Sequence, residues 1–387
     1  MNGSRYPGFH RLAPNDRLAR LEADGWLDAV EAGVLREELA PSLDGISENV
    51  VAGIRLPVGL VANMVVNGKP LLVPLATEEA SVVAACTKAA GLAALVGGVT
   101  AVRGERRIGA QVLFRTTLSS ADVQARLDTF LPDFKRAVSA AHPRLAAAGG
   151  GIQAVTFEAF NGRCPGAGTF LLLIDPVDAM GANLATSIAE QFAREIQGAM
   201  PGEGLGAIVT NYPLGRPAAA HVHLPHDLLS VKGMEGKAVG ERIEALSRWA
   251  GIDDKRAITH NKGILNGISG VLAALYQDTR AAIAALDAHA CRKGRMTPLA
   301  TWELTSECLV GRFEGPIVCG TVGGTGPHRP TTAPFMKLMR IAEVGDLEEA
   351  VASVGLLQNL GALLAMATTG IMPTHRKLHE RKVLHNG

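Results

Sequence analysis

The middle of the chain, from residue 106 to 215, interleaves strand-like and helical patterns of apolar positions. Short apolar runs over 107–114, 152–157, 169–174 and 207–210 predict four strands. Helical spacing from Ser120 through Phe134, and again over about 182–200, predicts two helices between them. The resulting order βαββαβ is typical of a ferredoxin-like unit rather than of regular βαβ repeats.

The flanking residues are rich in alanine and leucine at helical spacing. Stripes at 81–95, 240–249, 267–286 and 347–366 predict buried helices. We therefore expect an α+β protein built from a large, helix-rich, discontinuous domain and an inserted domain. The large domain comprises residues 1–105 and 216–372, the ferredoxin-like insertion comprises 106–215, and 373–387 form a C-terminal tail.

One stretch, 351–374, contains no charged side chain and is long enough to cross a bilayer. Gln358 and Asn359 would then lie at the bilayer centre, so a tightly packed core helix is the better interpretation. The N-terminal residues carry Arg5, Arg11 and Arg17 without an apolar core, unlike a signal peptide or an anchor. We expect no association with a membrane.

Charge and cysteine usage narrow the class of partner. The 38 basic and 37 acidic side chains give a net charge of +1, so no global field attracts nucleic acid, and a small-molecule partner is favoured. The five cysteines are far apart and include no C-x-x-C pair, which argues against a disulfide framework and a structural zinc site. A reducing cytoplasm fits this usage.

Four short segments carry candidate chemistry: 77–79, 259–263, 277–278 and 374–375. Together they supply a carboxylic acid, an ammonium, a second carboxylate and an imidazole, which is a complete set for reducing a thioester. Neither a G-x-G-x-x-G turn nor a G-x-x-x-x-G-K-[ST] loop is present, so a Rossmann cofactor site and phosphate-loop nucleotide hydrolysis are disfavoured.

Five segments occur in the order of a known family: 48–50, 73–81, 178–183, 259–264 and 320–324. On these segments, and on the position of the insertion, the chain resembles 3-hydroxy-3-methylglutaryl-coenzyme A (HMG-CoA) reductase of the bacterial class II type. The resemblance implies reduction of the HMG-CoA thioester to mevalonate and free coenzyme A, by two hydride transfers from NADPH or NADH, or the reverse oxidation. It also implies that the inserted domain binds the cofactor, that no metal takes part, and that a homodimer completes the site.

The resemblance also assigns catalytic roles. Lys262 matches the lysine that stabilises the oxyanion, and Glu79 matches the general acid that protonates the final alkoxide. Glu78 is the competing carboxylate, and Glu79 is preferred because it stands two residues before Ser81. Asp278 matches an aspartate between the glutamate and the lysine, where a shared proton network would couple them. His375 matches the histidine that protonates the coenzyme A thiolate.

Binding residues follow from the same resemblance. Arg256 matches the arginine that pairs with the free carboxylate of the acyl group, assisted by Ser81 and Asn266. The expected cofactor-binding residues are Asp178, Met180, Gly181, Ala182, Asn183, Asn211, Gly323, Gly324 and Arg144, and Arg11 is expected to contact coenzyme A. Relatives that prefer NADH carry an acidic residue where this chain reads 141–144 without one, so NADPH is favoured.

Two alternatives remain open. Related class II chains continue past the histidine into a helical flap, whereas this chain ends twelve residues after His375, which suggests a shortened flap. A catalytically impaired protein that binds coenzyme A thioesters is therefore the competing interpretation. A metal site could be built from His221, His223 and His226, or from His375 and His379, but no carboxylate at ligand spacing supports it.

Overall fold

The computed structural model describes residues 4–160, 164–324, 326 and 329–370. They divide into two compact units, Met1–Pro57 and Val58–Gly387. The first unit contains η1 (Phe9–Arg11), α1 (Pro14–Ala23), α2 (Ala29–Glu37) and η2 (Pro41–Leu43). The buried Arg17 guanidinium holds this small unit together, because it donates to the Phe9, His10 and Val50 carbonyls and pairs with Asp44.

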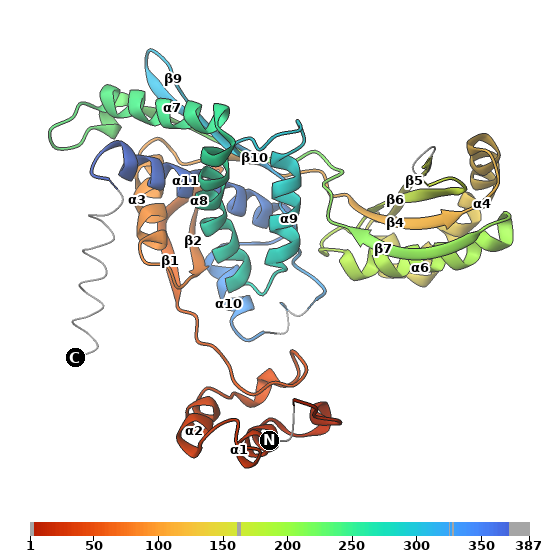
Figure 1. The fold of residues 1–387 in the computed structure, drawn as a ribbon. Coiled ribbons are helices and arrows are strands. Elements are labelled where there is room, and N and C mark those ends of the chain that lie inside the picture. Colours follow the sequence, from red (N-terminus) through yellow and green to blue (C-terminus); the bar gives the residue numbers. More distant parts are fainter. Residues whose placement is uncertain (1–3, 161–163, 325, 327–328, 371–387) are drawn as a thin grey trace. The chain divides into compact units, whose positions relative to one another are not determined.

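The larger unit has a helix-rich domain that also contains two sheets (Figure 1). Strands β1 (Val58–Val66) and β2 (Lys69–Ala76) form an antiparallel pair. A second sheet has the order β3-β8-β10-β9, from Thr100–Val102, Ala218–Pro225, Cys308–Gly315 and Ala300–Leu304. The helices of this domain are α3 (Val82–Ala94), η3 (His226–Leu229), α7 (Gly236–Ile252), α8 (Asp254–Ala274), α9 (Thr279–Ala290), α10 (Thr332–Leu338) and α11 (Val344–Ala367).

Helix α11 is the centre of this domain and packs against α3, α8 and β8 (Figure 1). Among the described residues it is the one helix whose length and composition would allow a membrane span, but 83% of its most apolar window is buried inside the protein. Glycine lets its neighbours approach closely, since a Cβ at Gly361 would lie 2.6 Å from the Ala85 carbonyl oxygen. The prediction of a tightly packed core helix is confirmed.

The inserted domain has the predicted βαββαβ order, with one additional short helix. Its elements are β4 (Ile108–Arg115), α4 (Ser120–Ala141), α5 (Pro143–Ala147), β5 (Gly151–Ala159), β6 (Ala167–Asp175), α6 (Ala182–Ala199) and β7 (Glu203–Thr210). The antiparallel sheet has the order β5-β6-β4-β7, and α4 and α6 pack on it around Phe134, Phe170 and Phe192. The α+β fold class is therefore confirmed.

Two predicted element boundaries differ from the structure: the start of β7 and the extent of the helix over 267–286. Strand β7 begins at Glu203, four residues earlier than predicted, because the glycines that suggest a loop allow Gly204 to pack tightly on Ala193. The apolar stripe at 267–286 is two helices rather than one. Tyr276 has a φ of 53°, which ends the helical path after α8, and the Asp278 side chain caps α9.

Candidate functional site

The segment 259–263 lies within α8. Two of its side chains face the core. The His260 Nε2 donates to the Ala300 carbonyl at 3.0 Å, and the Asn261 amide bonds to both the Thr297 carbonyl and the Leu299 N–H at 2.9 Å. They fix α8 to the segment leading into β9, so the following Lys262 points outward from a rigid helix.

The burial of His260 makes stability depend on pH. Burial is the main cause that lowers its pKa from 6.5 to about 4, with the Ala300 contact opposing it and the charge of Arg256 adding to it. Between these values the unfolded chain binds a proton that the folded chain does not. The contribution of neutral His260 to the free energy of unfolding is therefore fully present above pH 6.5. It decreases by about 3 kcal/mol as the pH falls from 6.5 toward 4.

We expect His260→Gln, which keeps an N–H donor but does not titrate, to show a smaller loss of stability on acidification. Urea unfolding at several pH values from 7.5 to 4.5 would measure the slope of the free energy of unfolding against pH for the unaltered protein and for the variant. His221 and His289, whose pKa values burial also lowers, are present in both proteins and cancel in the comparison. Equal slopes for the two proteins would contradict this assignment.

One cluster joins three of the predicted site residues. The Lys262 Nζ lies 3.0 Å from the Glu79 Oε2, and the Asn266 Nδ2 lies 3.4 Å from the same oxygen. Lys262 and Asn266 are four residues apart, so they share one face of α8. Glu78 is exposed, whereas Glu79 is partly buried and makes these contacts. The geometry thus favours Glu79 over its neighbour.

Ser81 stands at the start of α3 with a φ of 78°, in the left-handed region that a residue with a side chain rarely adopts. Its side chain makes no capping hydrogen bond to α3. Strained backbone of this kind persists where surrounding structure imposes it, and it is common at functional sites. Ser81 follows Glu79 by two residues, which agrees with a position at the edge of the same cluster.

A second group of predicted residues lines a cavity of about 500 Å³. It contains Asp278 and the following residues of the two expected cofactor loops: Met180, Gly181, Ala182, Asn183, Gly323 and Gly324. Gly181, with a φ of 93°, occupies the N-cap position directly before α6 and provides no side-chain cap. The backbone N–H groups of the first turn and the helix dipole make this end of α6 suitable for an anion.

The two expected cofactor loops, 178–183 and 320–324, pack closely against each other. A Cβ on Gly320 would lie 2.4 Å from the Met180 nitrogen, so only glycine allows this approach. The Thr321 N–H donates to the Asp178 carbonyl at 2.8 Å. The Asp178 carboxylate accepts from the Val344 N–H at 3.3 Å, at the start of α11. Asp178 therefore anchors its loop and is absent from the cavity lining.

Gln277 belongs to this site, although within the segment 277–278 we predicted a role only for Asp278. Its side-chain oxygen accepts from the Gly320 N–H at 2.9 Å, and its amide nitrogen donates to the Gly320 carbonyl at 3.0 Å. This reciprocal pair holds the 320–324 loop beside the start of α9. The available signal was its position directly before Asp278, in a polar dipeptide between two apolar helices.

Asp278 does not lie between Glu79 and Lys262 within one chain, contrary to the expectation. Its carboxylate accepts from the Arg280 and Ala281 N–H groups at 3.1 and 3.0 Å and so caps α9. In the part of the chain that the structure describes, no hydrogen bond or ion pair connects it to Glu79 or Lys262. The candidate catalytic groups therefore lie in two separate places, with Glu79 and Lys262 together in one cluster and Asp278 in the cavity with the cofactor loops.

Arg256 lies earlier on α8 and is partly buried. Its guanidinium lies 5.6 Å from the centre of the Trp249 ring, and one nitrogen contacts the Met366 sulfur at 3.6 Å. Burial lowers the pKa of Arg256. Its Nε has no hydrogen-bond partner among the described residues. A partly buried guanidinium whose Nε has no partner among the described residues is suited to a carboxylate ligand.

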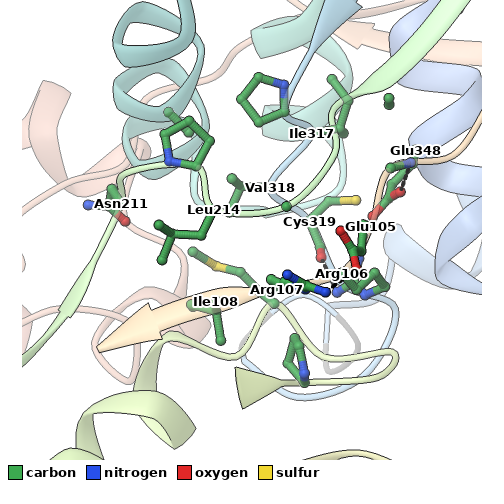
Figure 2. Close-up of a pocket in the computed structure, with 18 of the residues that line it drawn as sticks. Glu105, Arg106, Arg107, Ile108, Asn211, Leu214, Ile317, Val318, Cys319 and Glu348 are labelled. Atoms are coloured by element: carbon green, nitrogen blue, oxygen red, sulfur yellow. Dashed lines mark hydrogen bonds and ion pairs between the residues drawn. The ribbon is translucent and has the colours of Figure 1, made fainter. Parts of the chain in front are cut away.

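The remaining predicted residues lie elsewhere. Asn211 lines a different cavity (Figure 2), which shares Met180 with the first one. Arg144 is exposed on α5. Arg11 is exposed at the end of η1 in the first unit. His375 and His379 are outside the described residues. The His221 and His223 rings lie 5.7 Å apart on one face of β8, yet the described residues contain no group of three or more ligands that could hold a metal.

Comparison with known proteins identifies the family. A family model described as hydroxymethylglutaryl-coenzyme A reductase matches residues 15–380. A 3-hydroxy-3-methylglutaryl-coenzyme A reductase from Archaeoglobus fulgidus is 33% identical over 387 residues, which cover 98% of this chain and 86% of the relative. A probable reductase of the same name from Borreliella burgdorferi is 31% identical over 341 residues, covering 87% of this chain and 77% of the relative.

Solved structures agree with these relatives. The Streptococcus pneumoniae 3-hydroxy-3-methylglutaryl-coenzyme A reductase superposes with a TM-score of 0.81 at 31% identity, covering 97% of this chain and 90% of that one. A class II structure from the same organism, bound to NADPH in open conformations, gives 0.80 at 31% identity, covering 94% and 100%. By family model, relatives and structure, this chain belongs to the hydroxymethylglutaryl-coenzyme A reductase family.

Proposed function

We propose that this enzyme reduces the HMG-CoA thioester to mevalonate and free coenzyme A with NADPH. The observation that carries the proposal is the 3.0 Å contact between the Lys262 ammonium and the Glu79 carboxylate, with Asn266 beside them. Carbonyl reduction develops negative charge on an oxygen that must then be protonated, so a cation next to a proton donor fits the need. The same groups serve the reverse oxidation.

Each residue has a definite task in this proposal. A bound nicotinamide supplies the hydride. Lys262 stabilises the oxyanion as the thioester carbonyl becomes a hemithioacetal, and Glu79 donates the proton to the alkoxide of the product. By resemblance, His375 protonates the coenzyme A thiolate so that it does not attack the aldehyde again. Arg256 pairs with the free carboxylate of the acyl group.

The cavity beside α6 fits a dinucleotide. The uncapped first turn of α6 offers backbone N–H groups to a pyrophosphate, and the Gly323 and Gly324 positions have open space where a side chain would stand. The class II relative from Streptococcus pneumoniae was solved with NADPH. We therefore assign residues 180–183, Gly323 and Gly324 to the cofactor.

The separation between the Lys262–Glu79 cluster and the cavity that contains Asp278 supports a homodimeric site. Lys262 precedes the end of α8 at Ala274 by twelve residues, which is about 18 Å along a helix axis, and Asp278 lies beyond that end. We propose that Lys262 and Glu79 of one chain meet Asp278 and the cofactor cavity of a second copy. A two-fold dimer would then contain two equivalent sites.

An assay of cofactor oxidation tests the proposed reaction. Purified protein would be mixed with HMG-CoA and either NADPH or NADH, and absorbance at 340 nm and mevalonate would both be followed. We expect two cofactor molecules oxidised per mevalonate formed. Binding of HMG-CoA without cofactor oxidation, by a folded protein, would instead favour the alternative function of a coenzyme A thioester-binding protein.

Cofactor choice can be tested at Arg144. Helix α5 lies beside the cofactor loop, because Gly150 packs against both Leu145 and Val177. We propose that Arg144 accommodates the 2′-phosphate of NADPH. Arg144→Ala is expected to lower kcat/KM for NADPH roughly tenfold, as for loss of a hydrogen bond to a charged group, and to change NADH little. Arg136, an exposed arginine on α4, provides the matched control as Arg136→Ala. An unchanged ratio of NADPH to NADH activity in Arg144→Ala would exclude the role.

A further inference from the structure

Arg106 connects more segments around the cofactor cavity than any residue we predicted. It lies at the entrance to the inserted domain, two residues before β4 (Figure 2). Its guanidinium donates to the Val177 carbonyl, to the Ala179 carbonyl at 2.6 Å and to the Cys319 carbonyl at 3.1 Å. It also pairs with the Glu348 carboxylate at 2.5 Å. Its donors therefore meet four acceptors from three different segments.

Glu348 is an unusual partner because it is 4% exposed and lies in the apolar core helix α11. One carboxylate oxygen pairs with Arg106, and the other accepts from the Gly104 N–H at 3.0 Å. Burial raises the pKa of Glu348, and the charge of Arg106 opposes that rise. Burying an ion pair costs desolvation energy, so such a pair is weak evidence for stability alone.

The carbonyls that Arg106 holds belong to the loops that form the cofactor cavity. Val177 and Ala179 flank Asp178 at the start of the first loop, and Cys319 directly precedes Gly320 at the start of the second. Val177 has a φ of 53°, an unusual conformation for a β-branched residue, so this turn needs outside support. The Cys319 thiol is itself buried, and burial raises its pKa to about 12.

The HMG-CoA side of the site depends on other contacts. Lys262 and Asn266 lie on α8 and contact Glu79, and α8 is fixed through His260 and Asn261 rather than through Arg106. Loss of the Arg106 contacts should therefore disturb the cofactor cavity while the Lys262 cluster stays in place.

We propose that Arg106 and Glu348 form a positioning pair that fixes the spacing of the two cofactor loops and thereby sets affinity for NADPH. The proposal rests on the proposed function, in which this cavity binds that cofactor. Arg106 does not touch the reacting atoms in this arrangement. It acts through the backbone of 177–179 and 319–320.

The test compares Arg106→Lys with Arg107→Gln. Lysine keeps the charge but cannot reach four acceptors with one ammonium. Arg107 is the adjacent residue, and its guanidinium pairs with the Glu105 side chain at 2.5 Å, so it serves as the control. We expect Arg106→Lys to weaken NADPH binding, measured by fluorescence titration without HMG-CoA, roughly tenfold. The KM for HMG-CoA should change less than about twofold, and Arg107→Gln should resemble the unaltered protein.

Glu348→Gln provides a second variant if Arg106→Lys folds poorly. Its amide keeps one oxygen for Arg106 and turns an N–H₂ toward the Gly104 N–H, so NADPH affinity should fall in the same direction. Unchanged NADPH affinity in folded variants would overturn the proposal, as would equal losses for NADPH and HMG-CoA, which indicate a general structural role. Absence of NADPH binding by the unaltered protein would overturn the proposed function and the positioning role with it.

Discussion

Lys262→Ala is expected to lower kcat roughly 100- to 1,000-fold, the usual effect of removing a donor to a developing oxyanion. The variant should remain folded, because Lys262 points outward from α8 and its side chain is 60% exposed. The Glu79 carboxylate loses its cation but keeps the Asn266 amide at 3.4 Å. The dissociation constant of HMG-CoA should change far less than kcat, since the ammonium acts mainly on the transition state.

Lys255→Ala is the matched control for this substitution. Lys255 is an exposed lysine in the first turn of the same helix, away from the Glu79 contact. Steady-state rates at saturating NADPH, with HMG-CoA varied, would separate kcat from KM for both variants. If Lys262→Ala retained kcat within about threefold of the unaltered protein, Lys262 would not be the oxyanion donor.

Asp278→Asn is expected to abolish most turnover while leaving stability nearly unchanged. Asparagine caps a helix as well as aspartate does, so the bonds to the Arg280 and Ala281 N–H groups can persist while the charge is lost. We expect a loss of roughly 100-fold in kcat, in the range for proton-transfer groups. Asp278→Ala removes charge and cap together and should also lower the melting temperature. Full activity in Asp278→Asn would leave Asp278 only its capping role.

Mixing two inactive variants tests whether this aspartate serves the partner's lysine. If Lys262 and Asp278 of one site come from different chains, a heterodimer of Lys262→Ala and Asp278→Asn contains one site with neither substitution. Co-expression in equal amounts makes half of the dimers mixed, so about a quarter of the unaltered activity should return. If both residues came from one chain, every site in every dimer would carry a substitution, and no activity would return.

Much of the architecture could be predicted from local pattern. The βαββαβ order follows from alternating apolar runs, and the burial of α11 follows from an apolar surface on every side. Boundaries failed where glycine had a packing role, as at Gly204, or where a left-handed residue broke an apolar stripe, as at Tyr276. Both depend on contacts or backbone angles that residue type alone does not specify.

The identity of the chemical groups was determined by the sequence itself: a glutamate, a lysine, an aspartate and glycine-rich loops in a family-specific order. Their arrangement was decided only by the tertiary structure. It pairs Glu79 with Lys262, turns His260 and Asn261 toward the core, and places Asp278 with the cofactor loops. Arg106 and Glu348 are distant in sequence and ordinary in type, so their contact arises only when α11 packs beside the entrance to the inserted domain. The physical reason is that a motif records side-chain chemistry, whereas spacing, burial and hydrogen-bond partners are properties of segments brought together by folding.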